Sequence, residues 1–245
     1  MTAVPDPSGL TRPADQHHAM IEGQRSPAGR APADRSIPGR ALAAGFTQLV
    51  RRGLRGVWVR GELPSSAVVW AANHHSWWDG FVAAAVLQEQ HRPAALLMDG
   101  ANLSAFGFMR SAGVISAQRP RQALQVLREG RVLVIFPEGE LRSPGPLRTM
   151  ARGAAWLGSH APAAVVPVAV RVVSRGQQYA EALVDIAPEV APDELFAALK
   201  SQLEELDAAI ADCDPRAAVP GFRCAVKGRA SWDERLSRWA GAIRR

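Results

Sequence analysis

Cysteine is almost absent from this chain of 245 residues, since Cys213 and Cys224, both near the C-terminus, are the only two. Two cysteines cannot build the disulfide framework of a small secreted protein, nor a zinc site made of cysteines. A reducing compartment is therefore the default expectation. Lysine is equally scarce, because Lys200 and Lys227 are the only two and nearly all the positive charge comes from arginine.

The sequence also lacks an uninterrupted hydrophobic run of membrane-spanning length. The longest apolar stretch, residues 153–170, is interrupted by Ser159, His160, Pro162 and Pro167, and we divide it into a helix end, a turn and a strand. Residues 1–40 contain no apolar core of the kind that marks a secretory signal.

The net charge of +6 is unevenly distributed. Residues 1–60 hold 9 Arg/Lys against 4 Asp/Glu and residues 221–245 hold 7 against 2, whereas residues 61–220 hold 13 against 17. The two terminal segments are therefore basic and the central segment is mildly acidic. This pattern favours attraction of the terminal segments to an anionic surface, either lipid headgroups or nucleic acid. Nucleic acid is the weaker alternative, because the chain has no motif of interleaved aromatic and basic residues. We therefore expect no nucleic-acid partner.

Four segments differ in composition. Residues 1–38 are rich in Pro, Gly, Ala and Arg without helical or strand periodicity, which predicts a disordered tail. Residues 39–56 predict an amphipathic helix with an arginine face, either an ordinary surface helix or one that lies in a membrane interface. Residues 57–212 form the predicted folded domain. Residues 213–245 form a basic extension whose Cys224–Arg245 part predicts an amphipathic helix, packed on the domain or docked on a membrane or carrier protein.

Short apolar runs alternate with longer helical patterns between residues 57 and 212, which predicts one α/β domain. The expected strands are Val57–Arg60, Ala67–Ala72, Ala94–Met98, Val114–Ala117, Val132–Phe136, Ala164–Val172 and Leu183–Ile186. The expected helices are Gly80–Gln90, Leu103–Ser111, Arg121–Glu129, Thr149–Leu157 and Pro192–Asp212. The sheet should be mixed, largely parallel and flanked by helices.

The segment from Asn73 to Gly80 carries the first chemical signal, because it follows a buried strand, where open α/β sheets place their sites. If the chain turns there, the Asp79 carboxylate reaches an imidazole nitrogen of His74, fixes its tautomer and stabilises the imidazolium. Such a pair accelerates proton removal from a hydroxyl by roughly 100- to 10,000-fold. The alternative interpretation is a hydrogen-bonded loop histidine and an aspartate that caps a helix.

Three further blocks accompany this one. Strand Val132–Phe136 runs into Pro137, Glu138, Gly139, Glu140, Leu141 and Arg142, where glycine permits close backbone approach and Arg142 can bind an anionic oxygen. Between this block and the His74 block lie Gly113 and, six residues later, Arg119. An apolar strand further along the chain carries Pro167.

In this order and at these separations, the four blocks resemble the glycerolipid acyltransferase family, the group that contains lysophosphatidic acid acyltransferases. The matches are His74 to Asp79, Gly113 to Arg119, Phe136 to Gly139, and Val166 with Pro167, and they cover about Val57 to Ile186. The resemblance implies a glycerol-3-phosphate acyltransferase-like fold and direct acyl transfer from acyl-CoA or acyl-carrier protein. It implies no metal and no cofactor beyond that thioester.

The same resemblance implies roles for individual residues. His74 would remove the proton of the acceptor hydroxyl with Asp79 as its partner, and Arg119, Glu138, Gly139 and Arg142 would bind the acceptor. The expected partners are the thioester donor, a lipid acceptor, an anionic membrane surface and acyl-carrier protein as one of the two donors. The expected location is cytoplasmic, peripheral on the inner face of the cell membrane.

Two departures from the family pattern bear on the acceptor. The block after Gly139 is one residue longer than usual and adds Glu140, and Gln118 precedes Arg119 where an Asp is common. The acceptor therefore stays open between a lysophospholipid and a non-phosphate lipid alcohol or glycoside. A catalytically silent lipid-binding module is the alternative from another class, and the presence of both His74 and Asp79 disfavours it.

Overall fold

The computed structural model describes residues 37–243, with side chains described for residues 44–236 and Trp239. The predicted tail, 1–38, lies almost wholly outside this range. The helices are α1 (Ile37–Gly53), α2 (Asp79–Glu89), α3 (Gly100–Ala105), the 3-10 helix η1 (Gly107–Ala112), α4 (Pro120–Arg128), α5 (Gly153–His160), α6 (Leu195–Ala211) and α7 (Trp232–Ile243). The strands are β1 (Gly56–Arg60), β2 (Val68–Ala72), β3 (Ala94–Met98), β4 (Val114–Ser116), β5 (Val132–Ile135), β6 (Ala164–Val173), β7 (Glu181–Ile186) and β8 (Arg223–Lys227).

All eight strands belong to one sheet in the order β4-β3-β5-β2-β6-β7-β1-β8. Neighbours from β4 to β6 are parallel, as are β7 and β1, whereas β6 with β7 and β1 with β8 are antiparallel. The predicted α/β domain with a mixed, largely parallel sheet is confirmed.

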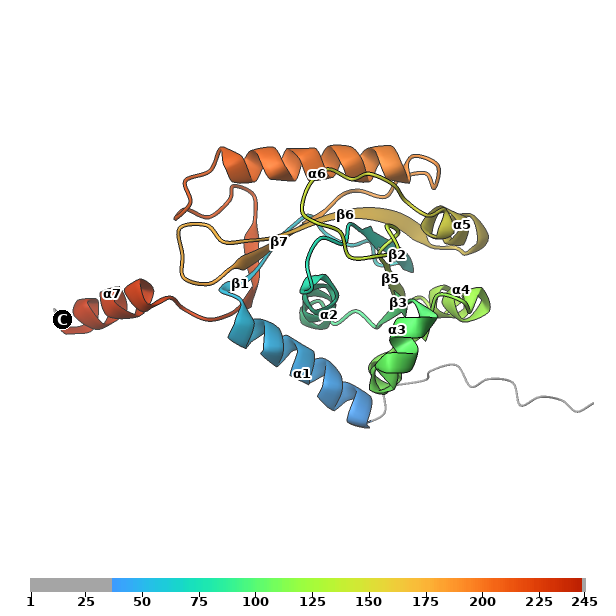
Figure 1. Cartoon of the computed structure of the whole chain (residues 1–245), viewed down its shortest axis with the longest axis horizontal. Helices are drawn as coiled ribbons and strands as arrows, with labels where there is room; N and C mark the ends of the chain where they lie inside the picture. The colour runs from blue at the N-terminus through green and yellow to red at the C-terminus, as the bar shows by residue number, and fades with distance from the viewer. Residues whose placement is uncertain (1–36, 244–245) are drawn as a thin grey trace, which may run out of the picture. The chain divides into compact units, whose positions relative to one another are not determined.

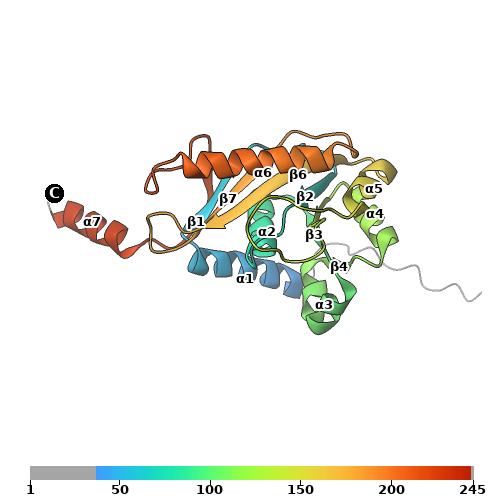
Figure 2. The same ribbon diagram turned by 45° about the horizontal axis from the view of Figure 1, so that its top comes forward.

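Helices cover both faces of this sheet (Figures 1 and 2). Alternate residues of β2 face opposite sides: Trp70 lies in the core cluster that α1 and α2 complete, and Val69 lies in the one that α4 and α5 complete. Leucines of α6 pack against β6 and β7 in a third cluster. Burial on both faces explains why the central strands read as continuous apolar runs.

Two helices predicted between residues 57 and 212 differ clearly from the structure. Helix α5 begins at Gly153 rather than Thr149, because the backbone N–H of Ala151 donates to the carbonyl of Pro137 at 2.7 Å and holds that stretch as a loop. The predicted helix Leu103–Ser111 is two short helices, α3 and η1, with a break at Phe106.

The prediction that Cys224–Arg245 is one helix is wrong for its first part. Residues 223–227 form β8, which pairs antiparallel with β1, and Val226 is buried against the core. The segment assigned to a C-terminal extension thus supplies the last strand of the sheet. Helix α7 begins only at Trp232.

Candidate active site

The candidate site lies where two neighbouring parallel strands, β2 and β5, end. The loop after β2 begins at Asn73, which is fully buried. Its side-chain amide donates to the carbonyl of Val170 at 3.0 Å, and its side-chain carbonyl accepts from the N–H of Val170 at 2.8 Å. Asn73 therefore fastens the start of the loop to strand β6.

His74 and Asp79 meet, as the sequence predicted. Nδ1 of His74 lies 3.0 Å from Oδ2 of Asp79, and the same oxygen accepts the backbone N–H groups of His75 and Ser76, each at 2.8 Å. Asp79 is the first residue of α2, where the helix dipole favours negative charge, and its exposed fraction is 1%. Since a carboxylate accepts, Nδ1 of His74 carries the hydrogen, and Nε2 is left with a free lone pair.

The turn after β5 packs on the other side of His74. Residues 136–139 form a tight turn in which the N–H of Gly139 donates to the carbonyl of Phe136 at 3.0 Å. Pro137 is the second residue of this turn, a position that suits the fixed φ of proline. Gly139 has φ +79°, a conformation that residues with a side chain rarely adopt. The Phe136 ring stacks on the His74 ring with centroids 4.4 Å apart.

Glu138 joins the two loops. One of its carboxylate oxygens accepts the backbone N–H of His74 at 2.7 Å, and Nε2 of His75 lies 3.2 Å from the carboxylate. Burial alone would raise the pKa of Glu138, but the hydrogen bonds from His75 and from the His74 backbone lower it by more, so that this pKa lies below its ordinary value. Glu138 is therefore a buried carboxylate that orients the His74 backbone.

His75 and Arg171 form a connection that the sequence interpretation missed. Nη1 of Arg171 lies 2.6 Å from Nδ1 of His75, and both side chains are buried. Arg171 also forms a two-pronged ion pair with Asp207 on α6, at 2.6 and 2.7 Å, and donates to the carbonyl of Gly145 at 2.8 Å. The sequence feature that could have revealed this connection is Arg171 itself, a single charged residue in the otherwise apolar strand β6.

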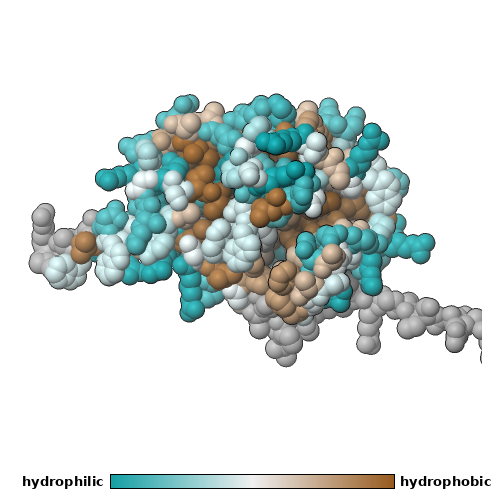
Figure 3. Space-filling model, in the orientation of Figure 1, coloured by the Kyte–Doolittle hydropathy of each residue, from teal (hydrophilic) through white to brown (hydrophobic). Residues whose placement is uncertain are grey.

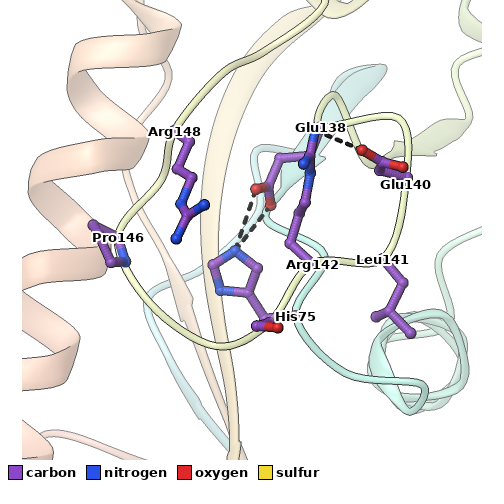
Figure 4. A pocket seen from close by; sticks show the side chains of 8 residues that line it. His75, Glu138, Glu140, Leu141, Arg142, Pro146 and Arg148 are labelled. Carbon is purple, nitrogen blue, oxygen red and sulfur yellow. Dashed lines mark hydrogen bonds and ion pairs between the residues drawn. The ribbon is translucent and has the colours of Figure 1, made fainter.

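A cavity of about 290 Å³ opens beside this network (Figure 4). Its lining is mostly polar: His75, Glu138, Glu140, Leu141, Arg142, Ser143, Pro146 and Arg148. Arg142 forms an ion pair with Glu140 at 2.6 Å, and its backbone N–H donates to the carbonyl of His74 at 2.8 Å. In Figure 4 the Arg148 guanidinium is directed toward His75. His75, rather than His74, borders the cavity.

Of the predicted site residues, Glu138 and Arg142 line this cavity, His74, Asp79 and Gly139 lie in the loops beside it, and Arg119 lies apart from both loops. Arg119 is exposed at the N-cap of α4, three residues after the end of β4. Strands β3 and β5 lie between β4 and β2, so Arg119 is separated from the His74 loop by about 14 Å of sheet width. It does lie at the same edge of the sheet, because these strands are parallel.

Residues 56–171 match the sequence model of the family described as Acyltransferase. The match spans slightly less than half of the chain. Among solved structures, the chain is similar to the 1-acyl-sn-glycerophosphate (LPA) acyltransferase PlsC from Thermotoga maritima. The two share 17% identity and a TM-score of 0.51 over 70% of this chain and 78% of that one. The chain has no significant match among the curated proteins.

The match to the Acyltransferase family model supports the family expected from the sequence motifs and the prediction of an acyltransferase enzyme. No helix among residues 37–243 combines the length and hydrophobicity needed to span a bilayer. Within the same range, no three His, Cys, Asp or Glu side chains are placed to hold a metal ion together.

Proposed function

We propose that the acyltransferase moves a fatty acyl group from acyl-CoA or acyl-carrier protein to a hydroxyl of a lysophospholipid-like acceptor, with His74 as general base. The observation that carries the proposal is the contact between His74 Nδ1 and the buried Asp79 carboxylate, which leaves Nε2 free to accept a proton. The His74 side chain is 24% exposed, so a hydroxyl can reach it.

The proposed reaction needs no covalent acyl-enzyme. The acceptor oxygen attacks the thioester carbonyl while its proton passes to Nε2 of His74, and the imidazolium is stabilised by Asp79. The tetrahedral intermediate then collapses, the carbon–sulfur bond breaks, and the thiolate takes the proton from His74. The ester and the free thiol leave, and His74 returns to its starting state.

The cavity beside Glu138 is the proposed acceptor site. Arg148 supports an acceptor with an anionic group, because within the described residues its guanidinium has no ion pair, whereas that of Arg142 is bound to Glu140. An anionic oxygen beside an arginine can accept two parallel hydrogen bonds. Gly139 would keep the turn open, and Arg119 would contact a more distant part of the acceptor along the sheet edge.

Apolar surface near the cavity suits the hydrocarbon part of a substrate. Leu141 lines the cavity and is exposed, and the space-filling view shows apolar atoms in a hollow near the centre of this face, surrounded by polar side chains (Figure 3). An acceptor held in a bilayer would place the enzyme on a membrane, for which we propose the inner face of the cell membrane.

A non-phosphate lipid alcohol or glycoside is the second candidate acceptor. Glu140 supports it, because this carboxylate neutralises Arg142 at the cavity and presents oxygens that accept hydrogen bonds from sugar hydroxyls. The two candidates differ in their need for Arg148: neutralising this residue should reduce turnover of a phosphate-bearing acceptor and leave a neutral one little changed.

The test measures thiol release by the purified protein with acyl-CoA or acyl-carrier protein, offered lysophosphatidic acid or a lipid glycoside. We expect His74→Ala to reduce turnover by roughly 1,000-fold or more. His160→Ala is a matched control, since the His160 ring is also stacked on an aromatic ring at 4.4 Å, far from the site, with its Nδ1 bonded to a backbone carbonyl. Turnover retained in His74→Ala would refute the general base, and no turnover with any pair of substrates would favour the silent lipid-binding module.

A further inference from the structure

A basic groove lies between the end of α1 and the connection from β8 to α7. Its volume is about 530 Å³. It is lined by five cationic residues and two small ones, without any acidic residue: Arg51, Arg52, Lys227, Gly228, Arg229, Ala230 and Arg235. Arg51, Arg52 and Lys227 are exposed, and none of the three makes an ion pair within the described part of the chain.

Backbone hydrogen bonds hold this groove in shape. The N–H of Gly228 donates to the carbonyl of Arg55 at 3.0 Å, and the N–H of Arg229 donates to that of Leu54 at 2.8 Å. Position 228 has to be glycine, because a Cβ there would collide with the carbonyl of Leu54. Arg55 is not one of the cations that line the groove, and its guanidinium is already paired with Glu181 and Glu234. Cations from two distant segments are thus fixed side by side.

Helix α7 adds an apolar stripe next to these cations. Trp232, Leu236 and Trp239 are spaced i, i+4 and i+7, which places them on one side of the helix, and their exposed fractions are 63%, 58% and 67%. In both ribbon views α7 projects away from the other helices (Figures 1 and 2). Indoles beside arginines on an exposed amphipathic helix are typical of a segment that lies in a bilayer interface.

The groove lies at the same edge of the sheet as the catalytic loop. Gly56, at the start of β1, is paired with Glu181 of β7, which is paired with Val173 at the end of β6. Strand β6 runs parallel to β2, so this is the edge from which the His74 loop emerges. The two features also touch, because Gly53, next to Arg52, packs so closely on Trp78 that any side chain there would overlap the indole.

We infer that this surface docks the acyltransferase on an anionic lipid bilayer. Lipid phosphates would occupy the groove, and the stripe of Trp232, Leu236 and Trp239 would enter the headgroup region. Trp77, in the catalytic loop and 59% exposed, would face the same bilayer. A bilayer fits better than an acidic protein because cations and largely exposed indoles occur together on this edge. The inference does not depend on which acceptor the enzyme acylates.

The test is sedimentation of the full chain with vesicles of phosphatidylcholine alone, or with about a third of the lipid replaced by phosphatidylglycerol. We expect strong binding only to the anionic vesicles, weakened by salt. Each neutralised groove cation should weaken partitioning roughly fivefold, so the triple variant Arg51→Gln, Arg52→Gln, Lys227→Gln should lose about a hundredfold. The double variant Trp232→Ser, Trp239→Ser should also bind less well at unchanged charge.

The matched control is Arg121→Gln, Arg128→Gln, Lys200→Gln, which removes the same charges from α4 and α6. It should bind anionic vesicles almost as well as the original chain. Equal losses in the two triple variants would overturn the inference, since binding would then follow net charge alone. Failure to bind anionic vesicles, with salt-dependent binding of an acidic acyl-carrier protein instead, would overturn it in favour of a protein partner. Because sedimentation is read without turnover, its failure is distinguishable from failure of the proposed reaction.

Discussion

Nη1 of Arg171 lies 2.6 Å from Nδ1 of His75, and this contact selects the tautomer of the imidazole. A guanidinium can only donate, so Nδ1 is the acceptor and the ring hydrogen is on Nε2, from where it is donated to Glu138. Glu138 in turn accepts the backbone N–H of His74. Arg171 therefore positions the loop of the candidate base through two intermediate residues.

Removing the guanidinium of Arg171 should disturb this loop without touching substrate. We expect Arg171→Met to lower kcat/KM by about 100-fold, since displacements of about 1 Å near reacting groups have effects of this size. The ¹⁵N signals of His75 should no longer show the single Nε2–H tautomer. Arg175→Met is the control, because Arg175 is also buried and bonded to Glu181 and two carbonyls but does not contact His75. Equal effects of the two variants on kcat/KM would contradict a positioning role.

The lowered pKa of Glu138 predicts a pH dependence of stability. A carboxyl whose pKa is lower in the folded than in the unfolded state stabilises the fold at pH values above its ordinary pKa, and this contribution is lost as the pH falls through the lowered value. Between about pH 6 and pH 3 the original chain should therefore lose more unfolding free energy than Glu138→Gln. Denaturant titrations at several pH values measure this difference. Glu205→Gln, on the exposed side of α6, should keep the original pH dependence, and a Glu138→Gln curve parallel to it would refute the assignment.

Gly139 and Gly145 lie in the same loop and should respond differently to alanine. Gly139→Ala should lower the unfolding free energy by about 1–2 kcal/mol, because φ +79° is strained for any residue with a Cβ. Gly145→Ala should be nearly neutral, since its φ is not in that region and its nearest new contact, the carbonyl of Ser143, is 4.0 Å away. Urea denaturation of both variants measures the difference, and a neutral Gly139→Ala would show that the turn can relax.

A similar pair on α1 tests how closely that helix is packed. Gly53→Ala would force a Cβ into Trp78 and should cost about 1–3 kcal/mol as α1 shifts from the sheet. Gly45→Ala, with nothing within 4 Å of the new Cβ, should instead stabilise the helix by about 0.5–1 kcal/mol. Thermal unfolding distinguishes the two, and destabilisation by Gly45→Ala would contradict the helical assignment there.

The central strands and the His74–Asp79 pair could be predicted because their signals are local. Runs such as Val132–Ile135 are apolar along their whole length, and a five-residue spacing brings an aspartate back to a histidine across one turn. The bond between His75 and Arg171 joins residues 96 positions apart, and sequence spacing says nothing about it. Strand β8 was missed because of its five residues only Val226 is buried, which leaves no alternation to detect.

Sequence order also concealed where Arg119 would lie. The motif after β4 follows the His74 block along the chain, but the sheet places β3 and β5 between β4 and β2. Strand order depends on which crossovers pack best, and this is a property of the whole core.

Removal of strand β8 would expose the edge of the sheet. A version that ends at Asp212 would strip β1 of its outer neighbour and uncover a row of hydrogen-bonding groups from Gly56 to Val59. An uncovered strand of this kind recruits strands from other molecules, so the truncated chain should aggregate where the full one stays dispersed. Strand β8 therefore protects β1 from pairing with strands of other molecules.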